Sequence, residues 1–173
     1  MKLRKPLIIT AIALTGLVAG GATPAAADDT ATTFALTGGP LALTVEATAT
    51  LTDEATGVAA NVITGTLGLV SVDDTRGGTA AWEVSVISTA FVGALGVPSS
   101  STSVSYTAGV VTETGTITVA DGVLTVVDTE QAVVSPSSLS GNNTASWTPT
   151  LDVSMPAGSL ADTYSGTVST SIL

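Results

Sequence analysis

The sequence contains no cysteine and no histidine among its 173 residues, and only four lysines and arginines. Without cysteine there is no disulfide framework, no thiol nucleophile and no lipid anchor on a cysteine side chain. Without histidine there is no Ser-His-Asp triad, no imidazole acid–base catalysis and no histidine ligation of zinc. Aromatic residues make up only 3% of the chain. These absences exclude several common classes of enzyme and of metal site.

The few cations are concentrated at the start of the chain, where three of the four lie within the first five residues. An apolar run follows over residues 7–18, and then small residues at Ala25 and Ala27, which match an A-x-A cleavage site. The apolar run is too short for a membrane-spanning helix, which needs about 20 residues. The sequence therefore predicts a signal peptide over residues 1–27 and a secreted mature chain over 28–173, with no integral membrane segment after cleavage.

The predicted mature chain is strongly acidic, because it keeps all fourteen aspartates and glutamates but only one cation, Arg76. Binding to nucleic acid depends on lysines and arginines that neutralise phosphates, so we expect no nucleic-acid partner. A chain of this size can bury about two-thirds of its unfolded surface, so it does not need disulfides to be stable.

β-branched residues dominate the predicted mature chain, with 28 threonines and 20 valines. Over residues 41–51 every second residue is apolar, and this period of two is typical of half-buried strands. We predict a single all-β domain over 28–173, an antiparallel β-sandwich of immunoglobulin-like or Greek-key type with about nine or ten strands. The remaining predicted strands cover residues 32–36, 62–72, 82–86, 102–108, 116–120, 123–127, 131–135, 146–153 and 164–172.

Three local signals make the strand prediction more specific. Asp121-Gly122 stands between two alternating runs and predicts a tight hairpin. The segment 135–143 is rich in Ser, Asn and Gly and predicts a turn. Pro149 has no N–H to donate to a neighbouring strand, so it predicts a sheet edge or a bulge.

The first candidate functional motif is the acidic segment that ends in Asp74, Arg76 and Gly77 and precedes Trp82. One interpretation is structural: a hairpin in which Arg76 pairs with Asp73 or Asp74, or stacks on the indole of Trp82. The alternative is functional: Trp82 is exposed, stacks on a sugar ring, and the nearby acids bind its hydroxyls. An alanine at Trp82 distinguishes the two interpretations.

The second candidate motif lies near the C-terminus of the sequence. Trp147 is placed in the middle of a predicted strand, and Tyr164 opens the last predicted strand, in which Val168 and Ile172 share one face. We take Trp82, Trp147 and Tyr164 as the candidate ligand-binding residues, because aromatic rings are the side chains best suited to stack on a sugar or another flat ligand.

These segments together resemble a known family, the WxL-domain surface proteins of Gram-positive bacteria. The sequence is most similar to the uncharacterised secreted WxL-like proteins of actinobacteria, and the similarity spans nearly the whole mature chain. The residues that carry it are Gly39-Pro40-Leu41, Val72-x-Asp74-x-Arg76-Gly77, Trp82-x-Val84, Met155-Pro156-x-Gly158 and Tyr164-x-Gly166-Thr167-Val168.

The resemblance implies a β-rich domain outside the cell that attaches non-covalently to the cell wall, through peptidoglycan. The first Trp of the family pattern falls on Trp82, with Val84 in place of the Leu. The second W-x-L is absent, because the sequence reads Thr170-Ser171-Ile172 where it should follow.

Two further possibilities concern metals and catalysis. Asp73, Asp74, Asp121, Asp128 and Glu130 are potential Ca²⁺ ligands, but they form no D-x-D-x-D-G loop, so we predict no metal and no cofactor. No nucleophile–base pair is evident, and we expect no enzymatic activity. Two functions stay open: a wall-binding module with cell-wall polysaccharide or peptidoglycan as its partner, and a structural subunit that joins other surface proteins through strand edges.

Overall fold

The computed structural model describes residues 30–57, 59–95 and 100–173. The chain divides into a unit over residues 1–35 and a second, compact unit over 36–173. The described part of the first unit, residues 30–35, contains no helix and no strand. The predicted signal peptide over 1–27 lies outside the described residues. Every strand in the described residues belongs to the second unit.

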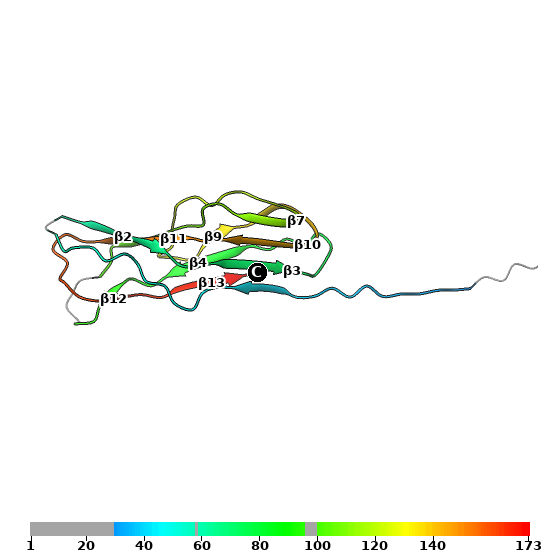
Figure 1. Cartoon of the computed structure of the whole chain (residues 1–173), viewed down its shortest axis with the longest axis horizontal. Coiled ribbons are helices and arrows are strands. Elements are labelled where there is room, and N and C mark those ends of the chain that lie inside the picture. The colour runs from blue at the N-terminus through cyan, green and yellow to red at the C-terminus, as the bar shows by residue number, and fades with distance from the viewer. Residues whose placement is uncertain (1–29, 58, 96–99) are drawn as a thin grey trace, which may run out of the picture. The chain divides into compact units, whose positions relative to one another are not determined.

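The second unit is all-β, with thirteen strands and no helix in its described residues, and all strand pairs are antiparallel (Figure 1). The predicted fold class, an antiparallel β-sandwich, is confirmed. The strands are β1 (Leu41–Thr44), β2 (Asn61–Thr66), β3 (Val70–Asp74), β4 (Val84–Ser88), β5 (Val92–Gly93), β6 (Ser103–Thr107), β7 (Thr112–Val119), β8 (Thr125–Val126), β9 (Gln131–Val134), β10 (Pro136–Trp147), β11 (Thr150–Met155), β12 (Tyr164–Ser165) and β13 (Val168–Ile172).

The first layer of the sandwich consists of two four-stranded sheets placed end to end, with the orders β1-β3-β10-β7 and β2-β11-β6-β8. Only two residues, Thr148 and Pro149, separate β10 from β11. On the neighbouring strand, the three residues 67–69 separate β2 from β3. Across this break the Leu67 N–H donates to the Pro149 carbonyl at 3.0 Å. The two sheets therefore form one layer in which each long strand is interrupted at the same level.

The second layer contains the three-stranded sheet β13-β4-β9 and the short β12-β5 pair. One side of the sandwich is closed by Val127, which lies between β8 and β9. Its N–H donates to the Val104 carbonyl of β6 at 2.9 Å, and its own carbonyl accepts from the Ser88 N–H of β4 at 2.8 Å. The chain thus passes from one layer to the other without losing its backbone hydrogen bonds.

The core lies between the layers and is built mainly from valines. Valine is β-branched and packs well on a pleated surface, which is why alternating valines mark the inward faces of these strands. The fully buried side chains also include three large ones, Trp147, Tyr106 and Leu151. The buried hydrophobic residues are Val70, Val72, Trp82, Val84, Val86, Val104, Tyr106, Ala108, Ile117, Val127, Val134, Ala145, Trp147, Leu151, Val153 and Met155.

The hairpin predicted at Asp121-Gly122 is wrong. β7 pairs with β10 and β8 pairs with β6, so the strands on either side of this turn do not pair with each other. The Gly122 N–H instead donates to the Gly109 carbonyl at 2.9 Å. Instead of returning along β7, the chain after Gly122 enters β8 beside β6, and Val127 is then buried between the two layers.

Several strand boundaries also differ from the prediction. The alternating run 41–51 is a strand only over β1, because its ladder partner β3 begins at Val70. Of the segment 135–143, residues 136–143 belong to the long strand β10 and not to a turn. Residues 32–36 contain no strand. Pro149 is buried and breaks the central β10–β11 run, so it does not lie at a sheet edge.

Within the described residues there is no helix of the length and hydrophobicity that crossing a membrane requires.

Candidate functional site

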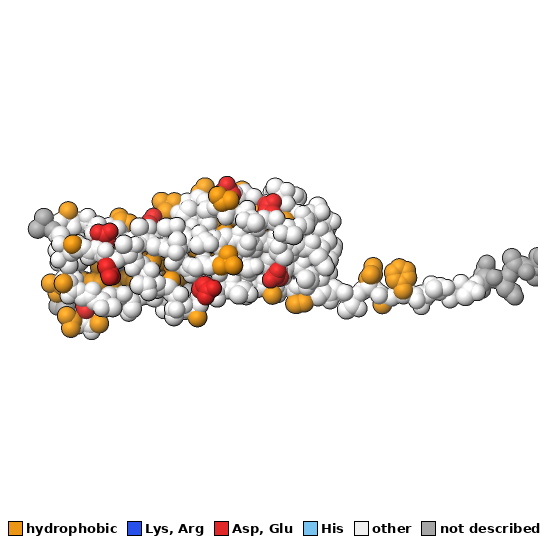
Figure 2. Space-filling model, viewed as in Figure 1, with side chains coloured by type: hydrophobic (Ala, Val, Ile, Leu, Met, Phe, Trp, Pro, Cys, Tyr) orange, Lys and Arg blue, Asp and Glu red, His pale blue; other side chains and the backbone are white. Residues whose placement is uncertain are grey.

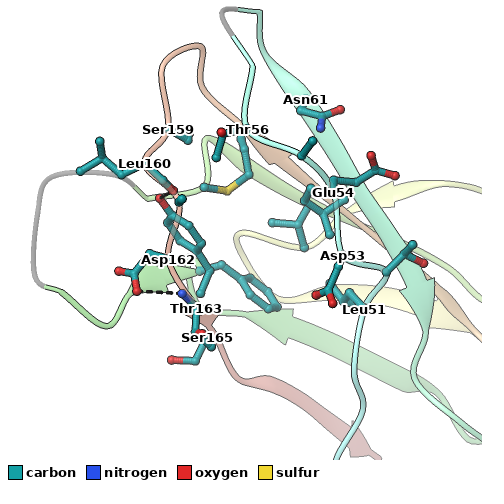
Figure 3. A pocket seen from close by; sticks show the side chains of 18 of the residues that line it. Leu51, Asp53, Glu54, Thr56, Asn61, Ser159, Leu160, Asp162, Thr163 and Ser165 are labelled. Atoms are coloured by element: carbon teal, nitrogen blue, oxygen red, sulfur yellow. Dashed lines mark hydrogen bonds between the residues drawn. The ribbon is translucent and has the colours of Figure 1, made fainter.

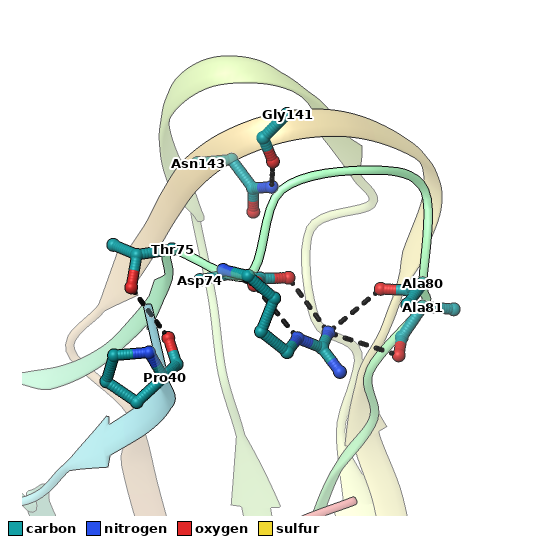
Figure 4. A network of polar contacts seen from close by, with 8 residues as sticks. Pro40, Asp74, Thr75, Ala80, Ala81, Gly141 and Asn143 are labelled. Carbon is teal, nitrogen blue, oxygen red and sulfur yellow. Dashed lines mark hydrogen bonds and ion pairs between the residues drawn. The ribbon is translucent and has the colours of Figure 1, made fainter. Parts of the chain in front are cut away.

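Asp74 and Arg76 form an ion pair at the end of β3 (Figure 4). The Arg76 guanidinium donates from Nε to Asp74 Oδ1 at 3.0 Å and from Nη2 to Asp74 Oδ2 at 2.9 Å. The Arg76 backbone N–H also donates to Asp74 Oδ1, at 3.1 Å. The same Nη2 reaches the carbonyls of Ala80 and Ala81 at 2.9 and 3.4 Å. The pair therefore holds the loop that precedes Trp82 against the end of β3.

The environment of Asp74 stabilises its charged form. The carboxyl is buried, and the hydrogen bonds from the Arg76 side chain lower its pKa below the usual value, outweighing the opposing effect of burial. Gly77 follows with φ of +71°, a left-handed conformation that suits glycine and turns the chain after Arg76. Of the predicted partners of Arg76, the structure selects Asp74.

The hairpin predicted around this ion pair is wrong, because β3 and β4 do not pair with each other. β3 pairs with β1 and β10 in the first layer, whereas β4 pairs with β13 and β9 in the second. The segment between them is thus a connection between layers. Asp74, Arg76 and Gly77 stabilise the conformation of that connection and have a structural role.

The structure places Trp82 and Trp147 in the core, each with only 2% of its surface exposed. The prediction of an exposed Trp82 on a ligand-binding face is wrong in this respect, because its indole has no face open to solvent. Trp147 donates from Nε1 to the hydroxyl of Tyr106 at 2.8 Å, and both rings are buried. Neither Trp is placed to stack on a ligand, and both act as packing residues.

A groove with a volume of about 780 Å³ is lined by residues at the start of β2 and the end of β11 (Figure 3). The pairing of the strands places it at the end opposite to the Asp74–Arg76 pair. One wall is the irregular segment 49–57 that follows β1, and the other is the segment 159–166 that contains β12. The ends of β2 and β11 contribute Asn61 and Met155 to its floor. The groove therefore gathers residues from several separate parts of the chain.

Tyr164 lies in this groove, together with Phe91. The Tyr164 hydroxyl donates to the Leu160 carbonyl at 3.0 Å, which fixes the ring against the 159–166 wall. Gly166 makes room for Phe91, since a Cβ there would lie 2.7 Å from Cδ2 of the phenyl ring. Of the three aromatic residues predicted as ligand contacts, Tyr164 is the one that the structure places at a solvent-open groove.

Three carboxylates line the same groove: Asp53, Glu54 and Asp162. Asp162 is held in place, because its Oδ2 accepts the Leu95 N–H at 2.8 Å and its Oδ1 accepts the Thr163 N–H at 2.7 Å. Asp53 and Glu54 are exposed on the facing wall, and Figure 3 shows them across the groove from Asp162. The arrangement combines aromatic surface with hydrogen-bond acceptors and negative charge.

Acidic side chains also mark the surrounding surface. Figure 2 shows several red carboxylate-bearing residues on the visible face and no blue lysine or arginine on that face. Within the described residues, no three His, Cys, Asp or Glu side chains come close enough to hold a metal ion. The five acids considered for Ca²⁺ in the sequence thus do not form such a group.

Sequence reasoning missed most of the groove. Phe91, Asp162 and the pair Asp53-Glu54 lie in segments that read as turns or short apolar runs, and no spacing motif connects them. The one sequence signal for the groove is aromatic content, because the chain has few aromatic residues and Phe91 lies outside every predicted strand. Comparisons of the chain with protein-family models, curated proteins and solved structures found no match.

Proposed function

We propose that this protein is a secreted, non-catalytic binding module that associates non-covalently with the cell wall. The observation that carries the proposal is the groove of about 780 Å³, which combines the rings of Phe91 and Tyr164 with the carboxylates of Asp53, Glu54 and Asp162. Its proposed ligand is peptidoglycan or another cell-wall polysaccharide, at the outer surface of a Gram-positive cell.

The chemistry of the groove suits a ligand that carries both sugar rings and amino groups. Aromatic faces pack against the apolar C–H face of a sugar, and carboxylate oxygens accept hydrogen bonds from hydroxyls. Peptidoglycan stem peptides also contain amino groups, which complement the negative charge of Asp53 and Glu54. The two walls lie on different segments, so a chain-like ligand would run between them.

The resemblance to WxL-domain proteins supports the wall as the binding partner but not the same contact residues. Trp82 is buried, and Thr170 stands where the second Trp is expected. In this chain we therefore assign wall contact to the groove around Tyr164 and assign Trp82 to stability. The absence of histidine and cysteine, and of an evident nucleophile–base pair, supports a non-catalytic role.

A sedimentation experiment tests this proposal. The chain 28–173 is mixed with isolated peptidoglycan and centrifuged, alongside the variant Asp53→Asn/Glu54→Gln. We expect the unchanged chain to sediment with the wall and the variant to remain in the supernatant, with the same melting temperature because both residues are exposed. The matched control is Asp73→Asn, an exposed acid on β3 outside the groove, which should sediment normally. An unchanged chain that stays in the supernatant disproves the proposal.

A second candidate function, a structural subunit of a surface assembly, is favoured by the sheet edges. β7 and β13 each pair with one neighbour only in the described residues. Edge strands usually carry charges that prevent pairing with other molecules. β7 has a single charged residue, Glu113, and β13 has none. Such edges are suited to strand addition by a partner.

A further inference from the structure

The sandwich is closed by hydrogen bonds on one side and open on the other. On the closed side Val127 bonds to both layers. On the open side β1 pairs only with β3, and β13 only with β4, among the described residues. A groove of about 300 Å³ lies on this side, between the segment 45–51 that follows β1 and the start of β13, and the buried side chains of Tyr106 and Leu151 lie at its base. The free edge of β13 therefore borders a groove whose base is formed by core residues.

The edge of β13 beside this groove is free of charge. Its sequence is V-S-T-S-I, with Val168, Thr170 and Ile172 half-buried on the inner face and Ser169 and Ser171 exposed on the outer face. The other wall is the irregular segment 45–49, and Glu46 is the one charged residue that lines the groove. An added strand would thus meet an apolar interior and an unpaired row of backbone groups.

One segment of the chain has the properties of such a strand. Residues 30–37 read T-A-T-T-F-A-L-T, carry no charge, and include the strand that the sequence predicts over 32–36. The structure assigns no strand to them. Phe34 and Leu36, which share one face of an extended chain, are 85% and 91% exposed. Both side chains are large and apolar, so their burial against a partner would lower the free energy of the complex.

We propose that residues 30–37 of one copy add as a strand to the free edge of β13 in a second copy, with Phe34 and Leu36 entering the groove. This inference rests on the second candidate function and names the contact through which copies join. Copies of so acidic a protein repel each other over most of their surface, and the two segments that meet here are uncharged. Because donor and acceptor surfaces differ, each copy can give one strand and accept another, which produces an open chain of subunits.

Sedimentation-velocity ultracentrifugation of the chain 28–173 over a concentration series tests the proposal. We expect oligomers that grow with concentration, and monomers only for the variant Phe34→Asp/Leu36→Asp, with the same melting temperature. Ala35→Asp is the matched control, because residue 35 points to the opposite face and should stay in solvent. A chain that is monomeric throughout, or a control that disrupts assembly as strongly as the double variant, overturns the proposal.

Disulfide trapping locates the contact, and it is specific because the chain has no cysteine of its own. Ala35→Cys protein is mixed with Ser169→Cys or Ser171→Cys protein and oxidised. We expect a disulfide-linked heterodimer with at least one of these two acceptors, and none with the control acceptor Thr116→Cys on β7. A heterodimer that forms as readily with Thr116→Cys, or with neither β13 variant, overturns the proposal.

These results separate the inference from the functions it builds on. Assembly that crosslinks through β7 leaves the structural-subunit function in place and removes only the β13 contact. A chain that is monomeric at all concentrations disproves both the β13 contact and the structural-subunit function. The variant Phe34→Asp/Leu36→Asp retains Asp53 and Glu54, so its sedimentation with peptidoglycan reports on wall binding independently of assembly.

Discussion

Trp147 donates a hydrogen bond of 2.8 Å from its indole Nε1 to the hydroxyl of Tyr106. Both side chains lie in the core and are almost fully buried. Trp147 is the last residue of β10, in one sheet of the first layer, and Tyr106 lies in β6, in the other. The bond therefore spans the level at which the long strands are interrupted. Burial of two polar groups is tolerated here because each serves as the partner of the other.

Tyr106→Phe should destabilise the protein by about 1–3 kcal/mol, because it leaves the buried Trp147 N–H without an acceptor. The measurement is urea denaturation at neutral pH, compared with the unchanged chain. Tyr164→Phe is the matched control: its hydroxyl bonds to a carbonyl at an exposed position, so we expect a change within about 0.5 kcal/mol. Equal effects of the two substitutions would contradict the role assigned to the buried bond.

The same tyrosine should make the protein sensitive to alkali. Burial raises the pKa of Tyr106 to about 12, and the hydrogen bond from Trp147 opposes this shift only in part. The folded state thus favours the neutral phenol, so the stability that it contributes is complete below about pH 10 and is lost as the pH rises toward 12. Melting temperatures above pH 10 should fall more steeply for the unchanged chain than for Tyr106→Phe, and tyrosinate absorbance should show one late-ionising group.

Trp82→Ala should cost about 3–5 kcal/mol of stability, as expected for a large side chain removed from a core. Thermal denaturation measures this loss directly. If the substitution leaves the melting temperature unchanged and abolishes wall binding instead, the assignment of Trp82 to the core is wrong. Wall binding by the folded fraction, assayed well below the melting temperature, should persist because the groove around Tyr164 is separate from Trp82.

The fold class could be predicted from the sequence because period-two alternation reports directly on which side chains face a core. Val84 and Val86 in β4, and Val168 and Ile172 in β13, occupy the inward positions that the pattern indicates. The pairing of strands was less predictable. Asp121-Gly122 is a good local hairpin signal, but the strand that follows it pairs with β6, and no local pattern contains this long-range pairing.

The candidate site was harder to predict than the fold, because its residues are distant in sequence and have no common motif. Tyr164 was identified as an aromatic residue at the start of a strand, whereas Phe91 and Asp162 come together only when the second layer is formed. The rings of the two tryptophans can stack on a ligand just as the ring of Tyr164 can. Burial, which decides between packing and binding, depends on the paired layers and not on the residue type.

Asp74→Asn should reduce stability at neutral pH and have progressively less effect in acid. The pKa of Asp74 is lowered in the folded state, chiefly by the hydrogen bonds from the Arg76 side chain, so the folded protein binds its proton less readily than the unfolded chain. The stability gained from the charged carboxylate is therefore present above its unfolded pKa and is lost as the pH falls below about 4.

Melting temperatures of the two proteins from pH 7 to pH 3 measure this effect. The unchanged chain should melt at a higher temperature at pH 7, and the difference should narrow as Asp74 becomes protonated. Asp73→Asn, one residue earlier and exposed, provides the control, since it has no ion pair to lose. A difference that stays constant across this range would mean that Asp74 stabilises the loop before Trp82 through its shape and not through its charge.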